Sequence, residues 1–240
     1  MFLLLTALTQ LGGLVWLASR RFRRPILAFL LIYAATWGAV QAVAPLAGRV
    51  ALPCRGEVLR MQSQLYCALM RNFVTPELRA LAEDAAIRVA REHPGTVTLA
   101  LDGGFPFLTG FPLLPHLSHD DGEKLDFALF YRDAEGAYAS GQTRSPLGYF
   151  AFESLDAPDD CADMRLTLRW SLPWAQGLFP DLDLDKPRTA ALARALLDDP
   201  RTGKVFLEPA LAARLGLSDP KLRFQGCRAA RHDDHIHVQL

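Results

Sequence analysis

The sequence lacks the patterns that mark several common classes of protein. It has no CxxC zinc knuckle, no glycine-rich phosphate loop between a strand and a helix, and no motif for a serine or cysteine nucleophile. Internal repeats and low-complexity linkers are also missing. Basic and acidic residues balance at 26 each, and no basic stripe follows the first fifty residues. These absences argue against nucleic-acid binding, phosphate-loop chemistry and a Ser or Cys nucleophile.

Charged side chains are absent from two long stretches near the amino terminus, residues 1–19 and residues 26–45. Four arginines separate the two stretches: Arg20, Arg21, Arg23 and Arg24. Each stretch is about long enough to cross a ~30 Å hydrocarbon layer as a helix. The pattern predicts a two-helix transmembrane hairpin over residues 1–46, followed by one domain over residues 47–240.

The arginine cluster predicts the orientation of this hairpin, because short loops rich in Arg and Lys stay in the cytoplasm. The remainder of the chain would then lie in the periplasm of a bacterium, anchored to the inner membrane. The alternative is a long signal peptide that is cleaved near Ala42 or Ala44. Both interpretations export residues 47–240.

Only four cysteines are present, and all follow the apolar segment: Cys54, Cys67, Cys161 and Cys227. An even set is typical of structural disulfides in an oxidising compartment. Three pairings are possible, and the sequence does not choose among them. Reduced buried thiols are the alternative.

Residues 47–240 are about the size of a single domain. Periodicity and capping signals predict helices over residues 58–71, 76–91, 189–197 and 209–215, and strands over residues 96–101, 126–131, 149–153, 165–170 and 235–238. Strands and helices in irregular order indicate an α+β domain built around an antiparallel sheet.

Five of the six histidines fall in two short segments, residues 116–126 and 232–237. In a strand, alternate residues share one face, so His235 and His237 point the same way. Asp126 opens an apolar strand, where an ionised carboxylate needs a partner or a cation. His119 precedes it through a loop in which Gly122 permits a tight backbone path. His119 and Asp126 from one segment and one histidine from the other would form an open metal site, as in catalytic zinc centres.

The pattern His119-x-x-Gly122-x-x-x-Asp126 with His235-x-His237 resembles the zinc peptidases that include lysostaphin-type enzymes, D-Ala-D-Ala metallopeptidases and the Hedgehog amino-terminal domain. The similarity is greatest to penicillin-insensitive murein endopeptidases, whose second motif has the form that His232-Asp233-Asp234-His235-Ile236-His237 reproduces. The resemblance covers these two motifs and their order in the chain.

The resemblance implies that His119, Asp126 and His237 bind Zn²⁺, and that His235, together with His232, is catalytic. The implied reaction is hydrolysis of peptide bonds in peptidoglycan stem peptides or their crosslinks. Four neighbouring carboxylates could orient the imidazoles: Asp120, Asp121, Asp233 and Asp234. His116 lies on the same loop as His119 and is a further candidate.

Two alternatives remain from the sequence. The chain could be a membrane-anchored zinc module that recognises peptidoglycan or a protein without cutting it, as Hedgehog domains keep zinc without peptidase activity. It could also be a metal-free exported interaction protein with surface histidines. The presence of His232 and His235 beside the expected ligands favours the enzyme.

Overall fold

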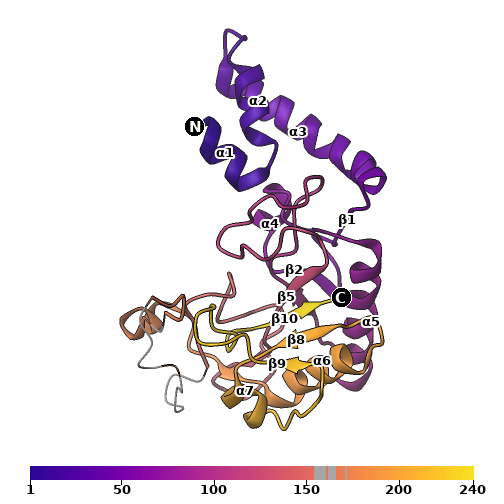
Figure 1. Cartoon of the computed structure of the whole chain (residues 1–240), viewed down its shortest axis with the longest axis vertical. Coiled ribbons are helices and arrows are strands. Elements are labelled where there is room, and N and C mark those ends of the chain that lie inside the picture. Colours follow the sequence, from indigo (N-terminus) through magenta and orange to yellow (C-terminus); the bar gives the residue numbers. More distant parts are fainter. Residues whose placement is uncertain (154–160, 162–165, 171) are drawn as a thin grey trace.

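The computed structural model describes residues 1–153, 161, 166–170 and 172–240. Three apolar helices at the amino terminus, α1 (Phe2–Thr9), α2 (Gly12–Ser19) and α3 (Pro25–Val43), project from one end of the molecule (Figure 1). A short 3-10 helix, η1 (Ala44–Ala47), joins α3 to the remaining chain. That remaining chain contains the sheet and the two histidine segments.

The first apolar run does not form the single long helix that its length predicts. It breaks at Gln10, whose φ is 66°, into α1 and α2, which pack against each other, and α2 also packs against α3. Each has eight residues and rises about 12 Å, too little to cross a bilayer. Within the described residues, one helix, over Pro25–Ala47, is long and apolar enough to span a membrane. The predicted pair of spanning helices is therefore not found.

A six-stranded sheet with the order β2-β4-β5-β10-β8-β9 forms the centre of the domain. Its strands are β2 (Leu59–Met61), β4 (Thr98–Ala100), β5 (Lys124–Ala128), β8 (Lys204–Phe206), β9 (Leu222–Arg223) and β10 (His235–Gln239). The four central strands pair antiparallel, as predicted, whereas β2 and β9 add parallel edges.

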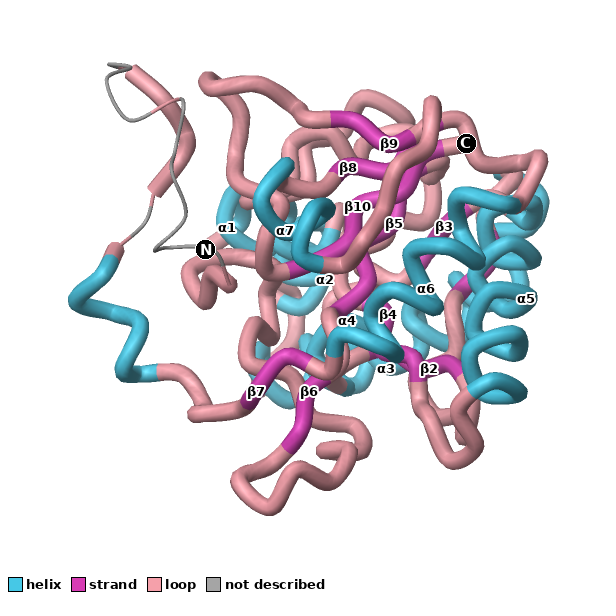
Figure 2. The backbone as a smooth tube through the Cα atoms, turned by 90° about the horizontal axis from the view of Figure 1, so that it is seen from below, coloured by secondary structure: helices cyan, strands magenta, loops and turns pink. Residues whose placement is uncertain are grey.

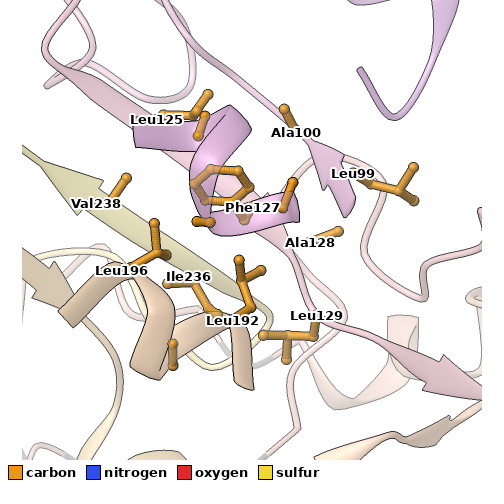
Figure 3. Packing of buried hydrophobic residues seen from close by; sticks show 14 of the residues in the cluster. Leu99, Ala100, Leu125, Phe127, Ala128, Leu129, Leu192, Leu196, Ile236 and Val238 are labelled. Carbon is orange, nitrogen blue, oxygen red and sulfur yellow. The ribbon is translucent and has the colours of Figure 1, made fainter. Parts of the chain in front are cut away.

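Helices α5 (Pro76–Glu92) and α6 (Lys186–Asp198) cover one face of this sheet (Figure 2). Phe127 of β5 and Ile236 of β10 pack with Leu192 and Leu196 of α6 in the main core (Figure 3). Because side chains alternate along a strand, burying these residues turns Asp126, His235 and His237 to the other face. The hydrophobic core therefore decides on which side the candidate site lies.

Local signals predicted several elements correctly. Helix α5 begins after Thr75, whose hydroxyl accepts a hydrogen bond from Leu78 N, and α6 contains the predicted residues 189–197. The expected helix over residues 209–215 is α7 (Pro209–Arg214), followed by Gly216 at φ 63°.

Other element predictions were wrong. The expected helix over residues 58–71 is instead strand β2 followed by the short helix α4 (Gln64–Ala68), because Leu59 and Met61 alternate inward against β4. Residues 149–153 form no strand. In the expected strand over residues 165–170, Arg165 lies outside the described residues, and residues 166–170 form none.

Smaller elements complete the domain. Strands β1 (Val50–Ala51) and β3 (Phe73–Val74) pair antiparallel, as do β6 (Tyr131–Arg132) and β7 (Asp183–Leu184), and η2 (Pro173–Leu178) is a 3-10 helix. All four cysteines form disulfides, Cys54 with Cys67 and Cys161 with Cys227. The structure thus confirms disulfides and selects one of the three possible pairings.

Candidate metal centre

The two histidine segments meet where β5 pairs with β10. Asp126 stands directly opposite His237 in the antiparallel register, and Nδ1 of His237 lies 2.7 Å from Oδ1 of Asp126. The Nε2 atom of His119 lies 3.3 Å from the same oxygen and 3.1 Å from Nδ1 of His237. All three side chains are buried. The structure therefore brings together the three residues that the sequence proposes as metal ligands.

The loop before β5 holds His119 in a defined orientation. Its Nδ1 donates a hydrogen bond to the carbonyl oxygen of Gly103 at 2.8 Å, so in the neutral ring Nε2 is the nitrogen without a proton, and it faces Asp126. Gly122 has a φ of 76°, and a Cβ there would lie 2.4 Å from Nε of Arg49. Glycine is therefore favoured at this turn by its backbone conformation, and any other side chain would also have to displace the end of the Arg49 side chain.

The predicted catalytic residue His235 lies beside these three. Its Nε2 is 3.8 Å from Oδ1 of Asp126, and its Nδ1 donates to Oδ1 of Asp234 at 2.7 Å. Asp234 in turn accepts a hydrogen bond from the Ser145 hydroxyl at 2.7 Å. This chain fixes the tautomer of His235 with Nε2 free to accept a proton. The His232 ring lies 4.9 Å from that of His235, centroid to centroid.

Each of the other flanking carboxylates lies beside a basic side chain. Asp233 forms a two-pronged ion pair with Arg231 at 2.6 and 3.0 Å, and Asp121 contacts Lys124. Asp120 lies within 4.0 Å of the same lysine. Of the four candidates, Asp234 alone contacts a site imidazole within the described residues.

His116 belongs to the centre more closely than its loop position indicated. Its Nδ1 is in close contact with Oδ2 of Asp126, and its ring stacks on that of His235 at 5.7 Å. Oδ2 of Asp102 lies 3.6 Å from the same Nδ1 atom and forms an ion pair with Arg71 at 2.6 Å. The His116-x-x-His119 spacing was the available sequence signal, but only the folded loop shows that both rings reach Asp126.

Burial and the Asp126 charge act in opposite directions on the site histidines. Burial lowers the pKa of His119, but Asp126 outweighs it and leaves that pKa raised. His235 is likewise buried, yet Asp126 and Asp234 raise its pKa to about 9. Burial alone would raise the pKa of Asp126, whereas the surrounding imidazoles, His119 first, hold it well below its usual range.

Two further imidazoles, those of His232 and His237, are kept neutral. Burial, which Asp126 offsets only in part, lowers the pKa of His237 to about 4. Burial together with the neighbouring His235 and His237 lowers the pKa of His232 well below its usual value. Neutral imidazoles next to an ionised carboxylate are the forms in which these side chains bind metals.

The residues present fit a bound divalent ion. Among the described residues, Nε2 of His116 and Nδ1 of His232 are buried without a hydrogen-bond partner, and Nδ1 of His116 and Oδ2 of Asp126 are in close contact without hydrogen-bond geometry. Buried polar atoms of this kind normally have partners. The groups His116–His119–Asp126 and His232–His235–His237 each place their ligand atoms within 4.8 Å of one another. Imidazole nitrogens with one carboxylate oxygen suit zinc and its neighbours in the transition series.

The centre opens to solvent through a pocket of about 200 Å³. Besides the histidines, its walls include Leu117, Tyr149 and Leu168. Gly148, at φ 65°, runs so close that a Cβ would lie 3.2 Å from His235 and 3.3 Å from His116. The sequence carries no signal for this close approach, because Gly148 has no side chain that could bind a metal.

The chain matches no known protein-family model, and no curated protein shows significant similarity to it. The chemistry of the centre must accordingly be inferred from its own geometry and from the motif resemblance.

Proposed function

We propose that the protein is a membrane-anchored zinc peptidase that hydrolyses peptide bonds in peptidoglycan stem peptides or their crosslinks. The observation that carries the proposal is the convergence of His119, Asp126 and His237 beside a fourth histidine that a carboxylate holds with Nε2 free. A closed structural site would have no use for that fourth group next to an open pocket.

His119, Asp126 and His237 would hold the zinc ion. When bound, zinc supplies Lewis acidity, which activates water as a nucleophile and polarises the amide carbonyl.

His235 would act as the general base. The Asp126 charge by itself raises the pKa of His235, and a bound zinc ion would offset that charge and leave the ring neutral. The Nδ1–H of His235 stays bound to Asp234, so Nε2 of the neutral ring would accept a proton from the attacking water and return it to the leaving amine. Asp234 stabilises the imidazolium that exists between these two transfers. His232, neutral and packed against His235, offers a second imidazole at the pocket wall.

The peptidoglycan substrate is supported by the motif resemblance and by the apolar amino terminus. One helix is long and apolar enough to span a membrane, and two disulfides agree with an oxidising compartment. A bacterial inner membrane with the domain in the periplasm would place the centre where stem peptides occur. The same observations apply to a zinc module that binds peptidoglycan or a protein without cutting it. A cleavage assay separates this binding module from the enzyme.

The test uses the full chain in detergent, loaded with zinc and incubated with crosslinked muropeptides. We expect about one zinc per chain and peptide-bond cleavage seen by mass spectrometry. His119→Ala should lose both metal and cleavage, whereas His235→Ala should keep most metal and lose cleavage by at least about 100-fold. His93→Ala, a change at the helix-end histidine outside the centre, is the control. Zinc retained with no cleavage of any wall fragment would leave the binding module as the function.

A further inference from the structure

The solvent-facing stripe of α3 is apolar along its whole length. Its exposed positions recur in pairs every four residues, and none carries a polar side chain: Ile26, Leu27, Leu30, Leu31, Ala34, Ala35, Gly38, Ala39, Ala42 and Val43. A helix packed on a soluble domain normally shows water a polar face. This exposed apolar stripe extends to Val43 and so includes the part of α3 that contacts the domain.

The opposite stripe of α3 is fastened to the domain. The Tyr33 hydroxyl donates to the carbonyl oxygen of Ala68 at 2.7 Å, and Trp37 Nε1 donates to that of Cys67 at 2.8 Å. Val40 and Ala44 continue this stripe into a buried cluster with Met70 and Phe73. The contact from residue 33 to residue 44 is about 16 Å long. Lipid that reaches Val43 on one side of α3 must therefore also reach the domain beside it.

Helices α1, α2 and α3 together form an anchor at the amino terminus. A second contact ties this anchor to the loop between β4 and β5, which carries His116 and His119. The side-chain oxygen of Gln10, at the break between α1 and α2, accepts hydrogen bonds from the backbone N–H groups of Phe107 at 3.1 Å and Leu108 at 3.4 Å. Phe107 also packs beside the buried cluster that α3 completes. The same loop continues to Pro115 and Leu117, which line the pocket of the metal centre.

Large apolar side chains are exposed where the anchor meets the domain. Leu46 is 88% exposed, Leu65 of α4 is 59% exposed and Leu108 is 60% exposed. Leu46 lies in η1 at the end of α3, Leu65 lies in the helix segment whose following carbonyls bind α3, and the Leu108 backbone N–H binds Gln10. Apolar side chains gathered around a membrane helix are typical of a surface that dips into lipid.

We propose that the domain itself rests in the bilayer surface through Leu46, Leu65 and Leu108, so that the metal centre acts on peptides tethered to the same membrane. The substrate class rests on the proposed peptidase function, whereas the lipid contact does not. Tethering would raise the local concentration of a lipid-linked stem peptide over that of a distant polymer.

Lipid is favoured as the occupant by continuity with the spanning helix and by charge. The arginines between α2 and α3 lie at the far end of the anchor, where the opposite lipid headgroups would be (Figure 1). A crevice of about 680 Å³ separates α3 from α4, with apolar walls from Leu30 and Ala34 and the guanidinium-bearing Arg55 at its edge. One cation beside an apolar wall suits a phospholipid.

The lipid contact is tested by spin labels on the full chain in phospholipid vesicles. The native cysteines are all bridged, so Leu65→Cys and Leu108→Cys each offer one thiol for a nitroxide. Ile87→Cys on α5 is the control, at an exposed apolar position away from the anchor. We expect relaxation by oxygen to exceed relaxation by a water-soluble nickel chelate at positions 65 and 108, with the reverse at 87.

Equal access of the nickel chelate to all three labels would overturn the lipid contact. Dipolar broadening at position 65 that disappears on dilution with unlabelled chain would assign the surface to a second copy instead, and would also overturn it.

The substrate class is tested with one muropeptide dimer in two forms, free and coupled to a phospholipid in the same vesicles. The tethered form should be cleaved about tenfold faster or more. The double variant Leu65→Asp/Leu108→Asp should bring that ratio near one without changing the free rate, and Ile87→Asp should leave it intact. A ratio of one for the unaltered chain would overturn the substrate class alone. Cleavage of neither form would overturn the peptidase and its substrate class together, while the labels still decide the lipid contact.

Discussion

The Nδ1 atom of His237 lies 2.7 Å from Oδ1 of Asp126, across the register of two strands that are more than a hundred residues apart in sequence. The pair joins β10 to β5, the strand that follows the loop of His119.

Asp126→Asn should reduce zinc affinity by more than about 100-fold, because the amide brings no negative charge to a buried site of imidazoles. The measurement is competition for zinc against a chromophoric chelator. Asp121→Asn, which alters a carboxylate beside Lys124 on the same loop, is the control and should bind zinc as the unaltered chain does. Equal affinities for both variants would remove Asp126 from the ligand set.

Gln239→Leu should weaken zinc binding by about 10-fold. The Gln239 side chain lies 3.0 Å from Nε2 of His237 and holds that ring with Nδ1 toward Asp126. The same chelator titration measures it, with the exposed Gln142→Leu as the control. An unchanged affinity would show that the strand alone orients His237.

Gly148→Ala should disturb the centre beyond its effect on the backbone. Both Gly148 and Gly136 have positive φ values, 65° and 79°, so an alanine at either costs about 1 kcal/mol of folding free energy. Only at 148 would the new Cβ press on His235 and His116. We expect both variants to lose similar thermal stability, while Gly148→Ala alone loses peptidase turnover. Equal turnover in the two variants would show that the close approach of Gly148 to His235 and His116 does not matter for the reaction.

Protonation of Asp185 should lower the stability of the domain in acid. Burial raises the pKa of this helix-capping carboxyl, but Arg132 at 3.1 Å and Arg188 at 2.6 Å outweigh burial and leave the pKa below its usual value. A lowered pKa means that the folded state favours the ionised form. The contribution to stability is therefore full above pH 3.8 and is lost as the pH falls through the folded-state pKa.

Asp185→Asn should accordingly cost about 2 kcal/mol at pH 7, and less at pH 3. Urea unfolding at the two pH values measures the difference. Asp183→Asn, an exposed carboxyl two residues earlier, is the control. A cost that is the same at both pH values would assign the effect to the helix cap and not to the charge.

Local patterns in the sequence were sufficient for part of this structure. The alternation in residues 235–238 placed His235 and His237 on one face, and the Thr75-Pro76-Glu77 signal placed the start of α5. Both depend on neighbours within a few residues, where backbone geometry and capping act directly. The prediction of helix over residues 58–71 failed because pairing with β4 overrode local preference.

The sequence by itself determined the types of the candidate ligands, the shared strand face of His235 and His237, and an apolar amino terminus. Tertiary structure alone decided that Asp126 faces His237, that His116 and the Gly148 loop close over His235, and that Gln10 interrupts the first apolar run to bind the loop of the centre. The reason is physical. Composition and periodicity act along the chain, whereas strand register and loop docking follow from how Phe127, Ile236 and Leu192 fill one common core.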